Sequence, residues 1–217
     1  MLEVKFYKVY NLENAAKVSQ YPTLLGKKMP ILDNTCSYDD ELRAKRLGSS
    51  PSNSGEDNFL SGILVAFDVV YPLYWAVEFE RYHFAQIVSS QSTMHSITSL
   101  HNIPFPQFVK LFNEYVDIEI IHRVYDMIKQ YNTTENLNER EKLFMKIKSN
   151  LPQGFQLQMH VVTNYLQLKT IYKQRKNHRL EDWKMFIEWM ESLPYFLELI
   201  GEKKSQLPTA YRGGGLC

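Results

Sequence analysis

The sequence has few cysteines and no long apolar run, and each absence excludes a class of protein. Cys36 and Cys217 are the two cysteines among 217 residues, and neither belongs to a C-x-x-C pair. The sequence therefore supports neither a zinc site nor a disulfide framework. No run approaches the roughly 18 apolar residues of a membrane span, and the N-terminus lacks the apolar core of a signal peptide. We expect a cytoplasmic protein without a membrane partner.

The sequence also lacks an excess of charge of either sign, because 25 Lys and Arg stand against 24 Asp and Glu, a formal net charge of +1. Non-specific polyanion binding needs a dominant basic field, so nucleic-acid binding is disfavoured as the main function. One local basic run, K-Q-R-K-N-H-R at 173–179, follows an apolar ladder. Such a run occurs at a solvated helix end, on a nucleic-acid-binding surface or in a pocket for a phosphorylated ligand.

Hydrophobic periodicity predicts an α+β domain with several helices around a small antiparallel or mixed sheet. Alternation predicts a strand at 2–6, and the continuous apolar run at 63–70 predicts a strand buried on both faces. We expect one domain over 1–200 with a loop-rich insertion at 20–58, followed by a flexible tail at 201–217. Helical spacing and breakers predict helices at 12–19, 73–86, 107–130, 139–149, 156–176 and 180–192.

Several segments, taken in order, form a series that recurs in one enzyme family. A-A-K-V-S occupies 15–19, and G-E-D-N-F-L-S-G occupies 55–62, ahead of an apolar run that ends at Pro72. R-Y-H follows at 81–83 and S-Q-S-T-M-H at 90–95. These correspond to A-A-R-V-S, G-H-x-[ST]-P-F-E-H, R-H-R and, after one inserted residue, E-x-S-x-R-Y. The series resembles that of the flavin-dependent thymidylate synthases, the ThyX family.

The C-terminal third matches the same family best. K-S-N-L-P at 148–152 corresponds to the family's R-x-x-L-P, and Asn164, Leu168 and Arg175 follow at the family's spacing without a gap. The resemblance spans roughly residues 10–197. It implies a ThyX-like α+β fold, in which the basic run contains a functional arginine, Arg175.

The resemblance implies roles for individual residues. Arg175 would contact the pyrimidine of bound deoxyuridylate and is the implied catalytic residue; as a pocket residue it should contribute little to folding. Its basic neighbours Lys173, Lys176 and Arg179 are expected to be solvated. The implied substrate-binding residues are Arg175, Lys148, Ser92, Glu78 and Arg81. The implied cofactor-binding residues are Asn58, Ser61, Arg81, His83, Ser90 and Asn164, with no metal ligand.

The family's reaction uses no protein nucleophile. A pyrimidine deoxynucleotide accepts a one-carbon unit from methylenetetrahydrofolate and then a hydride from reduced FAD, with NADPH as the implied reductant. The cofactor supplies the chemistry, whereas the protein supplies binding, orientation and fixed cations. The family's active sites lie between subunits of a homotetramer, so the resemblance implies that assembly here.

Each candidate residue also has an ordinary structural explanation. Arg81 and His83 suit a surface position, and Ser90 and Ser92 suit loop caps. Lys148 suits the C-terminal end of a helix. Asn164 stands inside a predicted helix, where asparagine has poor propensity, so we expect it to have a buried hydrogen-bonding role. For three nearby aromatic residues core packing is the favoured interpretation: Phe79, Tyr82 and Phe84.

The sequence departs from the family signature at six positions: Glu56, Glu78, Tyr82, His83, Met94 and His95. Losing a bidentate phosphate arginine should cost several kcal/mol of ligand binding. Three functions therefore stay open. The first is one-carbon transfer to a pyrimidine deoxynucleotide, including a hydroxymethyl product or another pyrimidine. The second is an inactive homologue that serves as a binding or oligomerisation module. The third and weakest is a nucleic-acid-binding protein.

Overall fold

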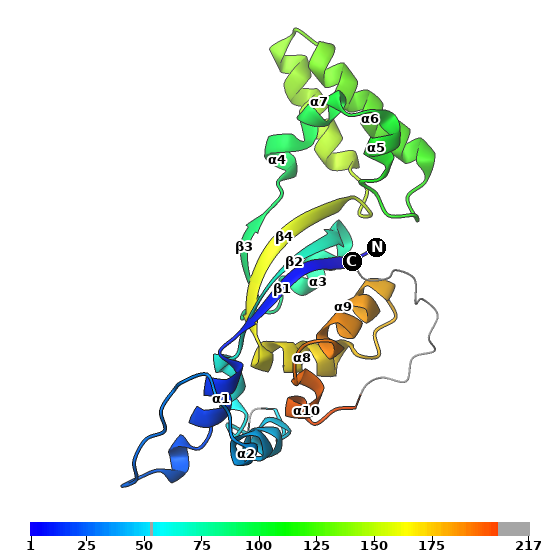
Figure 1. Cartoon of the computed structure of the whole chain (residues 1–217). Helices are drawn as coiled ribbons and strands as arrows, with labels where there is room; N and C mark the ends of the chain where they lie inside the picture. Colours follow the sequence, from blue (N-terminus) through cyan, green and yellow to red (C-terminus); the bar gives the residue numbers. More distant parts are fainter. Residues whose placement is uncertain (53, 204–217) are drawn as a thin grey trace.

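A computed structural model describes residues 1–52 and 54–203, whose helices surround one four-stranded sheet (Figure 1). The strands are β1 (Glu3–Tyr10), β2 (Leu64–Pro72), β3 (Gln86–Ser90) and β4 (Gln156–Asn164). The α-helices are α1 (Leu12–Val18), α2 (Tyr38–Gly48), α3 (Leu73–Phe79), α4 (Thr93–Ser96), α5 (Phe105–Val109), α6 (Ile118–Thr133), α7 (Leu137–Asn150), α8 (Tyr165–Arg175), α9 (Glu181–Glu191) and α10 (Phe196–Ile200). The 3-10 helices are η1 (Tyr21–Thr23), η2 (Asn58–Gly62) and η3 (Ile97–Asn102).

This architecture confirms the predicted α+β class. Of the tail expected at 201–217, residues 204–217 lie outside the described part of the chain. None of the helices in the described residues has the length and apolar character that a membrane crossing needs.

The sheet has the strand order β1-β2-β4-β3, and every neighbouring pair is antiparallel. β2 and β4 are the central strands and pair along their whole length, from Leu64 opposite Asn164 to Pro72 opposite Gln156. The sheet is therefore the axis of the molecule: α1 and α2 lie at one end, and α4 to α7 lie at the other (Figure 1).

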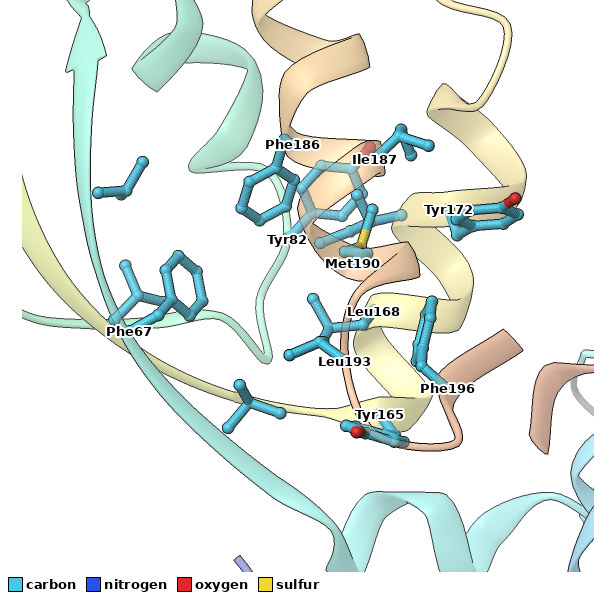
Figure 2. Close-up of a cluster of buried hydrophobic side chains, with 14 of the residues drawn as sticks. Phe67, Tyr82, Tyr165, Leu168, Tyr172, Phe186, Ile187, Met190, Leu193 and Phe196 are labelled. Carbon is cyan, nitrogen blue, oxygen red and sulfur yellow. The ribbon is translucent and has the colours of Figure 1, made fainter. Parts of the chain in front are cut away.

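Helices α3, α8 and α9 lie on one side of the sheet (Figure 1). Val65, Phe67 and Val69 alternate along β2 and are buried, because alternate residues of a strand face the same side. Figure 2 shows Phe67 near Phe186 of α9, and the ring centroids are 5.7 Å apart. The opposite face carries Asp68, which is partly exposed. The strand at 63–70 is confirmed. Its predicted burial on both faces holds only in part, because Ala66 is buried on this second face but Asp68 and Val70 are partly exposed.

A second apolar cluster lies in the helices beyond the start of β4. It includes Phe108 of α5, Val124 and Ile128 of α6 and Ile147 of α7, all of them buried. The helix predicted at 139–149 is confirmed as α7. The one predicted at 107–130 is wrong in its continuity, because the chain breaks between α5 and α6.

Hydrogen bonds to the start of β4 explain this break. The backbone N–H of Asn113 donates to the carbonyl of Gly154 at 2.9 Å, and that of Gln156 donates to the carbonyl of Leu111 at 2.7 Å. A Cβ on Gly154 would lie 2.4 Å from a Val116 methyl carbon, so only glycine fits there. Tertiary pairing has replaced the helical hydrogen bonds that the apolar spacing predicted.

The predicted helix at 156–176 is a strand followed by a helix, β4 and α8. Asn164 stands at the junction. Its side-chain oxygen accepts a hydrogen bond from the backbone N–H of Gln167 at 2.8 Å, which caps the helix. Its expected position inside a helix was therefore wrong, and its hydrogen bond has a capping role.

One further prediction is wrong in part, and the insertion at 20–58 contains a regular helix. The predicted helix at 73–86 ends at Phe79, and the edge strand β3 begins at Gln86. The loop-rich insertion at 20–58 contains α2, which starts with a capping box: the Ser37 side chain and the Asp40 side chain each bond the other residue's backbone N–H. That motif stabilises a helix start. By contrast, the strand at 2–6 and the helices at 12–19 and 180–192 are confirmed as β1, α1 and α9, within a few residues.

A buried lysine ties the insertion to α8. Lys169 is 0% exposed, and its ammonium donates to Asp57 at 2.5 Å and to the carbonyls of Gly48 at 2.8 Å and Ser50 at 2.7 Å. All three ammonium protons thus have acceptors, as a buried charge requires. This residue fixes the loop between α2 and η2 against the helix that carries Arg175.

Candidate functional site

Arg175 is the last residue of α8, and a polar cluster holds its guanidinium. The Nε–H donates to the Tyr82 hydroxyl oxygen at 2.9 Å, and Nη1 donates to Glu78 Oε2 at 2.7 Å. The guanidinium carbon lies 4.6 Å from the centre of the Trp183 ring, within range of a cation–π interaction. Arg175 is thus fixed in direction by a carboxylate, a phenol and an indole, which come from α3, from the segment after it and from α9.

Glu78 is the counter-charge of this cluster. Its Oε2 accepts hydrogen bonds from Arg175 and from Trp183 Nε1, at 2.8 Å in the latter case. His178 Nε2 lies 3.6 Å from the same oxygen. The carboxylate therefore faces cations and donors of this chain. A ligand that bonds the Arg175 guanidinium shares it with Glu78.

A pocket of about 380 Å³ lies beside this cluster, between α8 and the segment that links α3 to β3. Arg81 and His83 line it on one side, and α8 contributes polar side chains on the other. Cations and amide groups are the donors that phosphate oxygens need. The full lining is Arg81, Tyr82, His83, Phe84, Gln167, Thr170, Gln174 and Arg175.

Three further predicted residues lie at or beside the start of α8, outside the lining of this pocket. Gln167 lines the pocket, and its backbone N–H donates to the capping side-chain oxygen of Asn164. Its side-chain oxygen accepts a hydrogen bond from the backbone N–H of Phe84 at 3.3 Å. η2, which carries Asn58 and Ser61, leads into β2 beside the same helix start. The Ser61 hydroxyl donates to the carbonyl of Asn58 at 2.6 Å. This hydrogen bond is local, and a structural role in the loop is enough to explain Ser61.

Ser90, Ser92 and Lys148 lie toward the other end of the sheet. Ser90 ends β3 opposite Met159, and the Ser92 hydroxyl oxygen accepts from the N–H of Met94 at 3.2 Å to cap α4. The Lys148 ammonium donates to the Thr93 hydroxyl. Lys148 and Ser92 are thus brought together at the start of α4.

The chain does not bring Lys148 to Arg175. Lys148 precedes β4, whereas Arg175 follows it at the end of α8. The eight steps from Gln156 to Asn164 span roughly 26 Å at 3.3 Å per residue, and the two ends of the sheet are well separated in Figure 1. The substrate-binding residues implied by the resemblance therefore form two groups in one chain.

Sequence reasoning found the cations of this region but missed what surrounds them. Trp183, His178 and Gln174 were not among the predicted site residues, although all three contact Arg175, Glu78 or Tyr82. Trp183 follows the basic run by only four residues, and that closeness was the available signal.

The aromatic residues of this region divide between core and surface. Phe79 and Tyr82 are buried, which confirms the core interpretation for both. The same interpretation is wrong for Phe84, which is 71% exposed at the pocket rim. Its backbone explains this: Phe84 N–H and C=O bond to Gln167 and Thr163, so the side chain turns outward. Of the other basic side chains of the run, Lys173, Lys176 and Arg179 are exposed as expected.

Comparison with known proteins gives one consistent result, at the level of structure. Neither a protein-family model nor a curated protein matches the sequence. Two crystal structures of thymidylate synthase X from Helicobacter pylori, both with FAD and dUMP, match the structure with a TM-score of 0.64. Each match covers 92% of this chain, and 95% and 96% of the respective neighbour, at 13% and 11% identity. This chain therefore has the fold of the flavin-dependent thymidylate synthases.

Proposed function

We propose that the protein binds FAD and transfers a one-carbon unit to C5 of a pyrimidine deoxynucleotide. The observation that carries the proposal is the fold itself, combined with a cationic pocket where the matching motifs fall. The solved neighbours hold FAD and dUMP. In this chain Arg81 and His83 line that pocket beside Arg175.

The residues present fit part of an FAD molecule. Arg81, His83 and the side-chain amides of α8 offer donors to a diphosphate, and exposed Phe84 offers a ring at the rim against which a planar group can stack. The proposed cofactor set is completed by Asn58 and Ser61 of η2, by Asn164 at the start of α8, and by Ser90 at the end of β3. When bound, reduced flavin supplies the hydride. The chain's own residues hold the cofactor and direct charge at the substrate.

Arg175 is the proposed electrophilic residue toward the pyrimidine. Its guanidinium is preorganised by Tyr82, Glu78 and Trp183, so little reorganisation is needed when charge develops on the ring. Glu78 makes this arginine a weaker anion receptor than a free one, because part of its charge is already compensated. The proposal therefore assigns phosphate binding to Lys148 and Ser92.

This assignment requires a second chain. Lys148 and Ser92 lie at the far end of β4 from Arg175. One site would therefore combine Arg175 of one copy with the Lys148 and Ser92 positions of another copy. A homotetramer with sites between subunits has this property. Methylenetetrahydrofolate and NADPH are the proposed one-carbon donor and reductant.

FAD binding is the first test of the proposal. We expect saturating FAD to raise the melting temperature, because a ligand that binds only the native state stabilises it by about 2.7 kcal/mol at 100 times Kd. Arg81→Ala should remove most of that increase, since it removes an exposed pocket cation. Thermal unfolding with and without FAD measures both.

Lys146→Ala is the matched control, because Lys146 is exposed on α7 and lines no part of the pocket. It should keep the full FAD response. A wild-type melting temperature that stays constant at millimolar FAD would contradict the proposal. That result would favour the second function, an inactive homologue that keeps the fold as a module. The pairing of Glu78 with Arg175 is the observation in favour of that alternative.

A further inference from the structure

The segment between α1 and α2 projects from one end of the molecule and carries an exposed apolar tip (Figure 1). Residues 24–32, L-L-G-K-K-M-P-I-L, form what we call the tip loop. Leu25 is 97% exposed and Ile31 72% exposed, and Met29 and Leu32 are also exposed. Apolar side chains gathered on one projection mark an interaction site.

The base of the tip loop is fixed. The Lys17 ammonium donates to the Ile31 carbonyl at 3.0 Å and to Thr35 Oγ1 at 3.0 Å, and pairs with Asp33. The hydrogen bond from Lys17 holds the pKa of Asp33 well below its usual range, so this carboxylate stays charged and the pair stays intact at neutral pH. The tip loop is thus presented on a constrained base.

The tip loop is also basic, through Lys27 and Lys28, which are both exposed. Among residues 1–52 and 54–203 neither lysine has an ion-pair partner within 4.0 Å. A surface that receives this loop therefore needs apolar side chains together with negative charge.

The chain offers such a surface near the opposite end of the sheet, in the connection before α6 and the first residues of that helix. Residues 114–120, E-Y-V-D-I-E-I, form what we call the acidic patch. Tyr115 is 77% exposed, and Ile118 and Ile120 are also exposed. The exposed acidic side chains of the patch are Glu114, Asp117 and Glu119.

The positions of the two surfaces suit a contact between copies. In Figure 1 the segment between α1 and α2 lies at one end of the molecule, and α6 lies at the other. One copy therefore cannot bring its tip loop to its own acidic patch, and a second copy is needed. Each copy then makes two contacts, one through its tip loop and one through its acidic patch.

We propose that the tip loop docks on the acidic patch of a second copy of this chain. Leu25 and Ile31 pack against Tyr115 and Ile118, while the two lysines face the patch carboxylates. The contact itself does not depend on flavin.

Charge reversal in two variants tests the contact, measured by light scattering after size exclusion without FAD. The tip variant carries Lys27→Glu and Lys28→Glu, and the patch variant carries Glu114→Lys and Asp117→Lys. Each variant alone juxtaposes like charges in both contacts, so each should form a smaller assembly than wild type, with self-association weakened at least about 100-fold. An equimolar mixture pairs opposite charges in both contacts and should restore the wild-type mass.

The control variant carries Lys142→Glu and Lys146→Glu on exposed positions of α7 and should keep the wild-type mass. Melting curves show whether each variant is folded. A monomeric wild type, a tip variant of unchanged mass, or a mixture that stays small would overturn the contact. Binding of wild type but not of the tip variant to vesicles with anionic lipid, without association between copies, would assign the loop to a membrane surface instead. None of these outcomes depends on FAD binding, so they are distinct from a failure of the proposed function.

Discussion

Replacing Lys169 with methionine is expected to lower the free energy of unfolding by about 3–5 kcal/mol, the cost of removing one partner of a buried ion pair. The substitution keeps most of the side-chain volume but leaves the buried Asp57 carboxylate without its cation. It also leaves the Gly48 and Ser50 carbonyls without the donor that they share. Urea denaturation followed by circular dichroism measures the change.

Lys176→Met is the matched control, because Lys176 bonds Glu202 at the surface. A surface pair contributes up to about 1 kcal/mol. The double variant Lys169→Met with Asp57→Leu should recover part of the loss, since no unpaired charge then remains. If Lys169→Met unfolds within 1 kcal/mol of wild type, the lysine does not anchor the loop between α2 and η2.

Arg175→Lys is expected to lower the rate of product formation from deoxyuridylate by about two orders of magnitude or more, the scale for losing one preorganised donor at a developing charge. Lysine keeps the charge but loses the planar fork that bonds Tyr82 and Glu78 together. Steady-state assays of flavin oxidation and nucleotide product measure this loss.

The stability of the same variant needs a separate measurement. A pocket arginine would contribute little to folding, but the structure gives Arg175 contacts with Tyr82, Glu78 and Trp183. Losing one charge-assisted hydrogen bond should cost about 1.5–3 kcal/mol. Assays therefore belong at a temperature where melting curves show the variant folded.

Lys176→Ala is the control for activity, because Lys176 is the next residue and is exposed. It should change the rate by less than a factor of about two, since it contacts no part of the pocket. Equal losses of rate at Arg175 and Lys176 would show that the basic run is only a solvated helix end. The same conclusion would follow if activity at Arg175→Lys were lost only through unfolding.

The elements predicted correctly are those whose hydrophobic pattern is uninterrupted within the element itself. The continuous run at 63–70 became β2, and the helical spacing at 139–149 became α7. β4 was missed although Leu157, Met159 and Val161 alternate, because a true helix follows without a break and hid the change of period. The break before α6 depends on pairing with Gly154, which no local pattern contains.

The candidate site was predictable as a set of motifs but not as a set of contacts. The register of Arg81 and Arg175 came from the ordered resemblance, and both line one pocket. The hydrogen bonds from Arg175 and Trp183 to Glu78 join residues that are 97 and 105 positions apart in the sequence. Such pairs follow from how α3, α8 and α9 pack on the sheet, and a single sequence does not encode that packing in any short window.

The most direct test of the proposed function is the fate of deoxyuridylate incubated with the protein, FAD, methylenetetrahydrofolate and NADPH. The nucleotides are separated and their masses measured, with a parallel reaction that lacks FAD. We expect a product that carries one added carbon at C5, formed only when FAD is present and strongly reduced in Arg175→Lys. Unchanged deoxyuridylate, from protein that is folded and has FAD bound, would contradict the proposed transfer reaction.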